Sequence, residues 1–188
     1  MKKFAIITIV IILSLIFSYN CFEKQIYQYT HTVNNKYDSI LRPYKNQRII
    51  FIDYSLPSDK KRLWILEGDS VLLCCRVSHG KNSGLLYATE FSNVHKSNKS
   101  CIGKFKTMNS YQGKHGLSMR VKGLESTNNN AYSRSIVFHS ADYAEFDFLI
   151  KHGYLGRSFG CFATAANDNE KIIKLATEKK SIPVIVVN

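Results

Sequence analysis

The sequence lacks the residue spacings that hold zinc, because it has no CxxC pair and no two histidines separated by three residues. A structural or catalytic zinc site therefore has no support, and we expect neither a metal nor an organic cofactor. The chain also lacks internal repeats. It does not show the regular helices of about 10–15 residues that alternate with strands in a wound parallel sheet, so that fold class is not predicted.

Acidic residues are scarce: 14 Asp and Glu stand against 26 Lys and Arg, which gives a formal net charge of +12. The basic residues are scattered along the chain instead of following the pattern of a nucleic-acid reader, so we do not expect a nucleic-acid partner. For an exported protein, the charge favours attraction to an anionic cell envelope. Nothing in the sequence indicates an oligomeric state.

The first residues resemble an export signal. Lys2 and Lys3 precede an uncharged, mostly apolar run over residues 4–17, which is shorter than the ~17–25 residues of a membrane span. The residues before Cys21 lack the small side chain expected at a cleavage site, so an uncleaved anchor in the inner membrane remains an alternative. We therefore predict a signal peptide or membrane anchor over residues 1–21 and a location in the periplasm or cell envelope.

Apolar spacing of three to four residues predicts a helical spacer over residues 22–46, and residues 47–188 are long enough for one domain with a real core. Short β-rich runs dominate that domain. We expect a mainly β fold, with a mixed β-sheet or sandwich and a few short helices. The strands are predicted at residues 48–54, 62–67, 70–77, 103–107, 117–121, 136–139 and 182–187, and the helices at residues 141–151 and 167–178.

The second of these helices is expected to begin with Asn167 as its cap, with Glu170 three residues further on. Its apolar side is expected to consist of Ile172, Ile173, Leu175 and Ala176. The first is expected to turn Tyr143, Phe146, Leu149 and Ile150 inward and to end at Gly153. Both assignments follow from apolar residues that recur at helical spacing.

Five cysteines in an exported chain raise the question of disulfides. Cys74 and Cys75 are adjacent on a predicted strand and point to opposite faces, so we expect them to be unbonded apolar side chains. Cys161 is different, because it follows a small, polar turn that contains glycine, and His139 stands on an earlier apolar run. A thiolate is the reactive form of cysteine, and a nearby histidine can favour it at neutral pH.

Several ordered segments, from about residue 77 to the C-terminus, resemble the murein L,D-transpeptidase catalytic-domain family, the cysteine enzymes that cross-link peptidoglycan. The resemblance implies a mixed β fold with little helix. The segments are Val77-Ser78-His79-Gly80, Phe91-Ser92-Asn93, Ser100 to Thr107, Tyr111 to Arg120, Gly123-Leu124-Glu125, Ile136-Val137-Phe138-His139 and Leu155 to Cys161.

The resemblance implies that Cys161 is the nucleophile and His139 the general base, as a thiolate–imidazolium pair. It makes the backbone N–H groups of Gly160 and Cys161 the oxyanion donors, with Ser158 bonding the site or the substrate. Arg157 would bind a carboxylate of the stem peptide, although a brace of the turn through backbone carbonyls is an alternative. The remaining candidates for the border of the substrate cleft or a binding groove are Ser140, His79, His115, Tyr111, Lys114 and Arg120, and a purely structural role is the alternative for the two histidines.

Some positions depart from the family pattern: Phe159 stands where many members have histidine, Phe162 and Ala163 follow the cysteine, and Ser140 replaces a frequent glycine. These differences leave the substrate open. The expected function is acyl transfer between peptidoglycan stem peptides with release of terminal D-alanine. The alternatives are an L,D-carboxypeptidase that uses water as the acceptor, and a non-catalytic basic module that binds the cell envelope.

Overall fold

The computed structural model describes residues 11, 12, 14 and 36–188. Contacts divide the chain into two units, Met1–Pro43 and Tyr44–Asn188. In the first unit, residues 36–41 are helical, and the short 3₁₀-helix η1 (Arg42–Tyr44) follows them. Most of the predicted signal segment and of the 22–46 spacer lies outside the described residues, so both stay predictions. Within the described ranges, no helix has the length and apolar character needed to cross a membrane.

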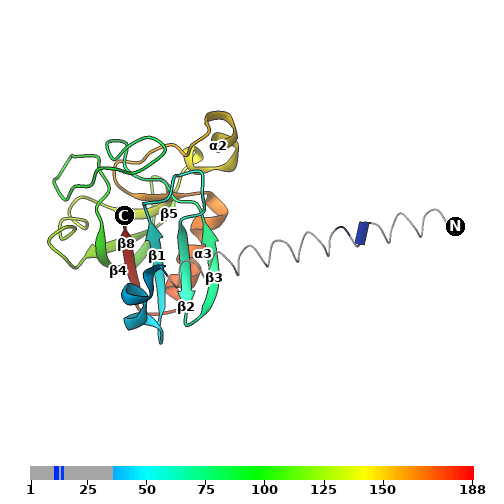
Figure 1. Cartoon of the computed structure of the whole chain (residues 1–188). Coiled ribbons are helices and arrows are strands. Elements are labelled where there is room, and N and C mark those ends of the chain that lie inside the picture. Colours follow the sequence, from blue (N-terminus) through cyan, green and yellow to red (C-terminus); the bar gives the residue numbers. More distant parts are fainter. Residues whose placement is uncertain (1–10, 13, 15–35) are drawn as a thin grey trace. The chain divides into compact units, whose positions relative to one another are not determined.

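The second unit is built on one mixed sheet of eight strands in the order β3-β2-β1-β8-β4-β5-β6-β7 (Figure 1). The predicted mainly β fold is confirmed. The strands are β1 (Arg48–Asp53), β2 (Leu63–Glu67), β3 (Ser70–Cys75), β4 (Gly103–Gly113), β5 (Gly116–Gly123), β6 (Val137–Ser140), β7 (Phe162–Thr164) and β8 (Pro183–Val187).

The strands at the centre of the sheet are formed by apolar runs of the sequence. Every residue of β1 is buried, as are the three middle residues of β8, and these two strands pair in parallel. Strands buried on both faces read as continuous apolar runs instead of alternating ones. Cys74 and Cys75 lie on β3 and are free thiols, as predicted.

Helix α3 (Ala166–Thr177) lies behind the sheet in Figure 1 and contacts β4, β5, β6 and β7. Its Ile172, Ile173 and Ala176 are buried in the core, as the spacing predicted, while Leu175 is only partly buried. The predicted Asn167 cap is wrong. The helix begins one residue earlier, and the N–H of Ala166 donates to Glu145 Oε1 at 2.8 Å.

The helix predicted over residues 141–151 is two pieces, η2 (Asp142–Ala144) and α2 (Phe146–His152). Glu145 between them has extended backbone, and its side chain is the one that binds the start of α3. The predicted apolar side is also wrong, because Phe146 and Ile150 are exposed and only Leu149 of α2 is buried. The end of the helix at Gly153, which has a left-handed φ of 77°, is confirmed.

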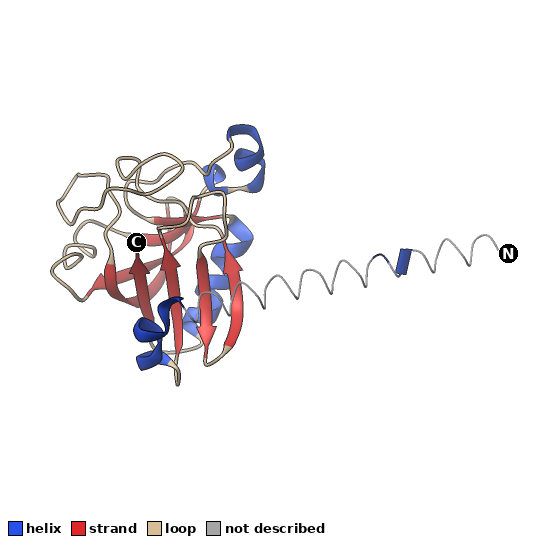
Figure 2. Cartoon of the chain, in the orientation of Figure 1, coloured by secondary structure: helices blue, strands red, loops and turns tan. Residues whose placement is uncertain are grey.

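Loops gather at one end of the sheet (Figure 2), and the longest stretch without a strand or helix runs over residues 76–102. Strand β4 extends to Gly113, well beyond the predicted end, and its pairing with β5 shifts between Thr107 and Ser110. Strand β7 was not predicted. It has three residues and pairs in parallel with β6, and it is this pairing that positions the candidate site.

Candidate active site

The β6–β7 pair brings Cys161 and His139 to the same face of the sheet. Phe138 pairs with Phe162, and their stacked rings lie in the core with centroids 4.7 Å apart. Because side chains alternate along a strand, His139 and its partner Ala163 lie on the opposite face. Cys161 precedes β7 by one residue, so the same alternation places its side chain on the His139 face.

The imidazole of His139 is oriented by its own strand. Nδ1 lies 2.8 Å from the carbonyl oxygen of Ser140. A carbonyl only accepts hydrogen bonds, so we assign the ring proton to Nδ1, which leaves Nε2 as an acceptor. Burial of the ring lowers the pKa of His139, the hydrogen bond to the Ser140 carbonyl raises it in part, and the nearby His115 lowers it by a smaller amount. A neutral imidazole with a free acceptor nitrogen can take a proton from a thiol.

The hairpin between β4 and β5 places His115 against His139. Lys114 and His115 form its two-residue turn, between the paired Gly113 and Gly116. The two imidazole rings have centroids 4.7 Å apart. Ser140 Oγ donates to the carbonyl oxygen of His115 at 3.3 Å, which ties the turn to β6. The predicted border residues His115 and Ser140 therefore flank the predicted base, and their contact with substrate stays a prediction.

The thiol of Cys161 is half-buried and lies 3.5 Å from the carbonyl oxygen of Ser135, to which it donates. It does not bond His139 in this arrangement. Burial raises the pKa of Cys161 above that of an ordinary thiol, and the Val137 backbone and the charge of Arg134 offset this only in part. The electrostatics thus favour a neutral thiol and a neutral imidazole, which differs from the thiolate–imidazolium pair expected from the sequence.

The turn before Cys161 is closed by Ser158. Its hydroxyl donates to the Cys161 carbonyl oxygen at 2.7 Å and accepts the Gly160 N–H at 3.0 Å. Gly160 has a φ of +116°, and a Cβ there would lie 2.8 Å from the carbonyl oxygen of Lys99, so the position requires glycine. The Gly160 N–H, one of the two oxyanion donors expected from the resemblance, is thus bonded inside the turn, and the oxyanion role of the Cys161 N–H stays a prediction.

The loop that contains Ser78 and His79 is hydrogen-bonded to this turn and to β7. The Ser158 N–H donates to the carbonyl oxygen of His79 at 2.9 Å, and the Ser78 N–H donates to that of Ala163 at 2.8 Å. The His79 side chain is fully buried, with Nδ1 2.8 Å from Arg62 Nη2. Burial and the adjacent Arg62 charge lower the pKa of His79 to about 4. His79 therefore serves the scaffold in its neutral form.

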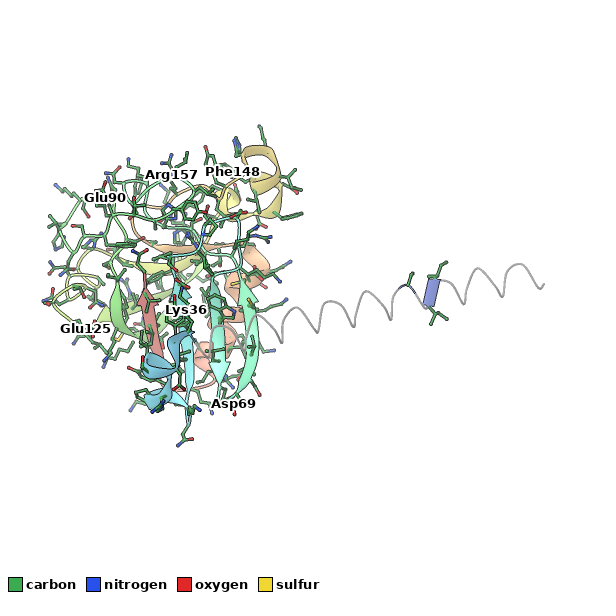
Figure 3. The ribbon with its side chains drawn as sticks, in the orientation of Figure 1. Lys36, Asp69, Glu90, Glu125, Phe148 and Arg157 are labelled. Atoms are coloured by element: carbon green, nitrogen blue, oxygen red, sulfur yellow. The ribbon has the colours of Figure 1, made fainter. Side chains whose placement is uncertain are left out.

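Arg157 is exposed at the end of the domain where Figure 3 also labels Glu90 and Phe148. Its Nη1 lies 3.3 Å from the carbonyl oxygens of both Lys81 and Gly84. These contacts connect the turn of the candidate nucleophile to the loop that supports it. Such contacts with backbone carbonyls are those expected if Arg157 stabilises the turn, which is the alternative that the sequence left open. Binding of a substrate carboxylate by Arg157 stays a prediction.

Two residues near the thiol were not predicted. Arg134 donates from Nη1 to the Ser92 carbonyl oxygen and from Nη2 to that of Lys99, both at 2.6 Å. The same Nη2 lies 3.1 Å from where a Cβ on Gly160 would stand, so its charge is close to the turn of Cys161. Ser135 has a left-handed φ of 56°, a conformation rare for a residue with a Cβ, and presents its carbonyl to the thiol. Neither arrangement has a local sequence signal.

A cavity of about 370 Å³ opens beside His115 and Ser140. Its lining combines the hairpin turn, the start of the segment after β6 and the first residue of α3. The lining residues are Lys114, His115, Ser140, Ala141, Asp142, Tyr143, Glu145 and Ala166. In residues 36–188 and the few others described, no group of three His, Cys, Asp or Glu side chains is arranged to hold a metal ion.

A family model described as the L,D-transpeptidase catalytic domain matches residues 16–184. The chain therefore belongs to this family, and the resemblance found in its motifs is confirmed. No curated protein matches the chain in sequence.

Solved structures of L,D-transpeptidases match part of this chain at low sequence identity. L,D-transpeptidase 3 from Mycobacterium tuberculosis is 14% identical with a TM-score of 0.47, over 75% of this chain and 60% of that one. The L,D-transpeptidase from Mycobacterium smegmatis is 15% identical with a TM-score of 0.44, over 74% and 58%. The catalytic domain of the E. faecium enzyme is 16% identical with a TM-score of 0.42, over 75% and 97%. The chain spans only 49% to 60% of the longer matched chains.

Proposed function

We propose that this protein is a cysteine acyltransferase that cross-links peptidoglycan stem peptides. The observation that supports it most is the β6–β7 register, which sets Cys161 and His139 on one face of the sheet in a chain of the L,D-transpeptidase catalytic-domain family. The substrate would lie in the cell envelope, which is consistent with the export signal expected at the N-terminus.

In the first half-reaction, the Cys161 thiol rotates away from the Ser135 carbonyl and gives its proton to His139 Nε2. As the proton leaves, Sγ attacks the carbonyl that joins the L-centre of the diamino acid to the terminal D-alanine. The C–N bond breaks, and the protonated imidazole returns the proton to the leaving amine of D-alanine. We assign stabilisation of the developing oxyanion to the Cys161 N–H, a contribution on the order of 3 kcal/mol when well aimed.

In the second half-reaction, an amine of a neighbouring stem attacks the thioester and gives its proton to His139. The thioester C–S bond breaks, Sγ regains a proton and the cross-link is complete. The cavity beside His115 and Ser140 supports an amine acceptor over water, because it provides room and carries the carboxyl groups of Asp142 and Glu145. An ammonium group approaching His139 from that side would meet these carboxylates.

The test incubates the full chain with disaccharide-tetrapeptide and identifies the products by mass spectrometry. We expect a cross-linked dimer and free D-alanine from the wild type, and neither from Cys161→Ala. Cys74→Ala is the matched control, since Cys74 is a half-buried free thiol on β3. A shortened monomer without dimer would indicate the carboxypeptidase, and product formation by Cys161→Ala would refute Cys161 as the nucleophile.

A further inference from the structure

Arg120 is held on the candidate active-site face without an acidic partner. Its guanidinium carbon lies 4.5 Å from the centroid of the Tyr111 ring and 5.8 Å from that of Tyr132. Within the described part of the chain, no carboxylate forms an ion pair with it. Two aromatic faces thus orient a half-buried cation, while the donors of its planar fork have no anion to bond.

The sheet register places this cation in line with the nucleophile. Arg120 on β5 pairs with Val137 on β6, and one residue further along β6 Phe138 pairs with Phe162 of β7. Stepping back one residue on both strands sets Val137 beside Cys161. Arg120, Val137 and Cys161 therefore form one cross-strand row, and alternation puts their side chains on one face of the sheet, opposite to that of Phe138 and Phe162.

Tyr111 and His139 define the next row of the same face. Tyr111 on β4 pairs with Ser118 on β5, two residues before Arg120. Continuing the β5–β6 register by two residues from the Arg120–Val137 pair sets Ser118 beside His139 on β6. The neighbouring residues Met119 and Val121 point to the other side and are buried in the core. The face that holds the thiol and the imidazole thus continues across β5 to the cation and its two tyrosines.

We infer that Arg120 is a substrate-binding residue that recognises a carboxylate of the stem peptide away from the scissile bond, an inference that rests on the proposed function. Two strand spacings separate its backbone from that of Cys161, on the order of 10 Å. An extended chain advances about 3.3 Å per residue, so a carboxylate on the residue next to the diamino acid falls within reach of the fork once the length of the Arg120 side chain is added. A guanidinium bonds a carboxylate with two parallel hydrogen bonds, which lysine cannot do.

The role contrasts with that of Arg157, the arginine that the sequence favoured for this task. Arg157 uses Nη1 on two backbone carbonyls at the exposed end of the domain. Arg120 has its ring contacts on the faces of the guanidinium, where they leave the in-plane N–H groups available. The roles of the two arginines can therefore be distinguished with substrates that differ only in the charge of their carboxyl groups.

The experiment measures binding to the full chain carrying Cys161→Ala, so that no turnover intervenes. The probes are the tetrapeptide stem with free carboxylates and the same stem with every carboxylate amidated except that of the terminal D-alanine. We expect Arg120→Gln to weaken binding of the free-carboxylate stem on the order of ten- to a hundredfold and to leave the amidated stem nearly unchanged. Arg120→Lys should lose most of the same selectivity, because the fork is lost while the charge is kept.

Lys122→Gln is the charge-matched control, because Lys122 lies two residues along β5, is exposed and pairs with Lys106. It should leave both affinities unchanged. Equal affinity of the Cys161→Ala protein for both stems, no binding of either stem, or equal losses in Arg120→Gln would overturn the inference. Selective binding together with a wild type that forms no product would instead refute the proposed reaction and leave the assignment of Arg120 intact.

Discussion

The Cys161 thiol donates to the carbonyl oxygen of Ser135, 3.5 Å away, and not to His139. A hydrogen bond from the S–H group favours the neutral thiol, as does burial, which raises the Cys161 pKa. His139 is shifted in the complementary direction, because burial lowers its pKa and favours the neutral ring. This geometry therefore favours the proton on sulfur, and we expect proton transfer to accompany attack on the substrate.

This arrangement predicts the pH dependence of Cys161 alkylation. The thiolate fraction rises with pH through the pKa, which lies above the ~8.5 of a free thiol, so alkylation should be slow at pH 7 and still increasing above pH 8.5. His139→Ala should change this profile little, yet lower turnover by about 10²- to 10⁴-fold, as expected for loss of a general base. Mass-mapped iodoacetamide labelling across pH provides the measurement. A plateau below pH 7 in the wild type that moves upward in His139→Ala would show a preformed ion pair.

Ser158→Ala should weaken the turn that carries the nucleophile. The hydroxyl bonds the Gly160 N–H and the Cys161 carbonyl in a nearly fully buried place, so its loss leaves two backbone groups unpaired. We expect the free energy of unfolding to fall by about 1–3 kcal/mol and kcat to fall more than KM changes. Ser133→Ala, which removes an exposed hydroxyl, is the control for denaturant unfolding. Unchanged stability with a raised KM would assign the hydroxyl to the substrate.

Arg134→Met should raise the pKa of Cys161 further, because the Arg134 charge is one of the influences that lower it. At a fixed pH below that pKa, alkylation of Cys161 should slow by roughly three- to tenfold. Arg134→Lys retains the charge and should recover most of the rate while losing part of the bonding to Ser92 and Lys99. If Met and Lys slow alkylation equally, the residue acts by holding these loops and not by its charge.

The long, continuous apolar runs made the sheet predictable. The β1 and β8 segments are buried on both faces, which is the pattern that their sequences show. Strand β7 has only three residues, too few to establish a period of two, and it exists because β6 offers it a parallel partner. Helix α2 was misassigned for a related reason: Glu145 leaves the helix to bond Ala166, a contact 21 residues away that no local pattern records.

The candidate site also contains residues that the sequence identified and residues whose position depends on tertiary structure. The resemblance to a family identified Cys161 and His139, but the use of the Ser158 hydroxyl inside its own turn depends on backbone geometry that the sequence does not express. Arg134 reaches the site through carbonyls of residues 92 and 99, which only tertiary folding brings together. The sequence offered Arg120 only as one of several candidates for a binding groove, and strand register places it beside Val137.

Arg157→Met tests whether the exposed arginine braces the turn or binds substrate. Its Nη1 contacts with the Lys81 and Gly84 carbonyls are partly solvated, so their loss should lower the free energy of unfolding by only about 0.5–1.5 kcal/mol. A brace holds the nucleophile whatever the substrate carries. Turnover should therefore fall by the same factor on stems with free and with amidated carboxylates, whereas Arg120→Gln should discriminate between them.

Arg157→Lys sharpens the comparison, because a lysine can still donate to one carbonyl but cannot bond a carboxylate through a fork. As a brace, this variant should retain most of the stability and most of the turnover on both stems. Steady-state kinetics with the two stems, alongside denaturant unfolding of each variant, gives the result. A loss confined to the free-carboxylate stem, with unchanged stability, would return the recognition of that group from Arg120 to Arg157.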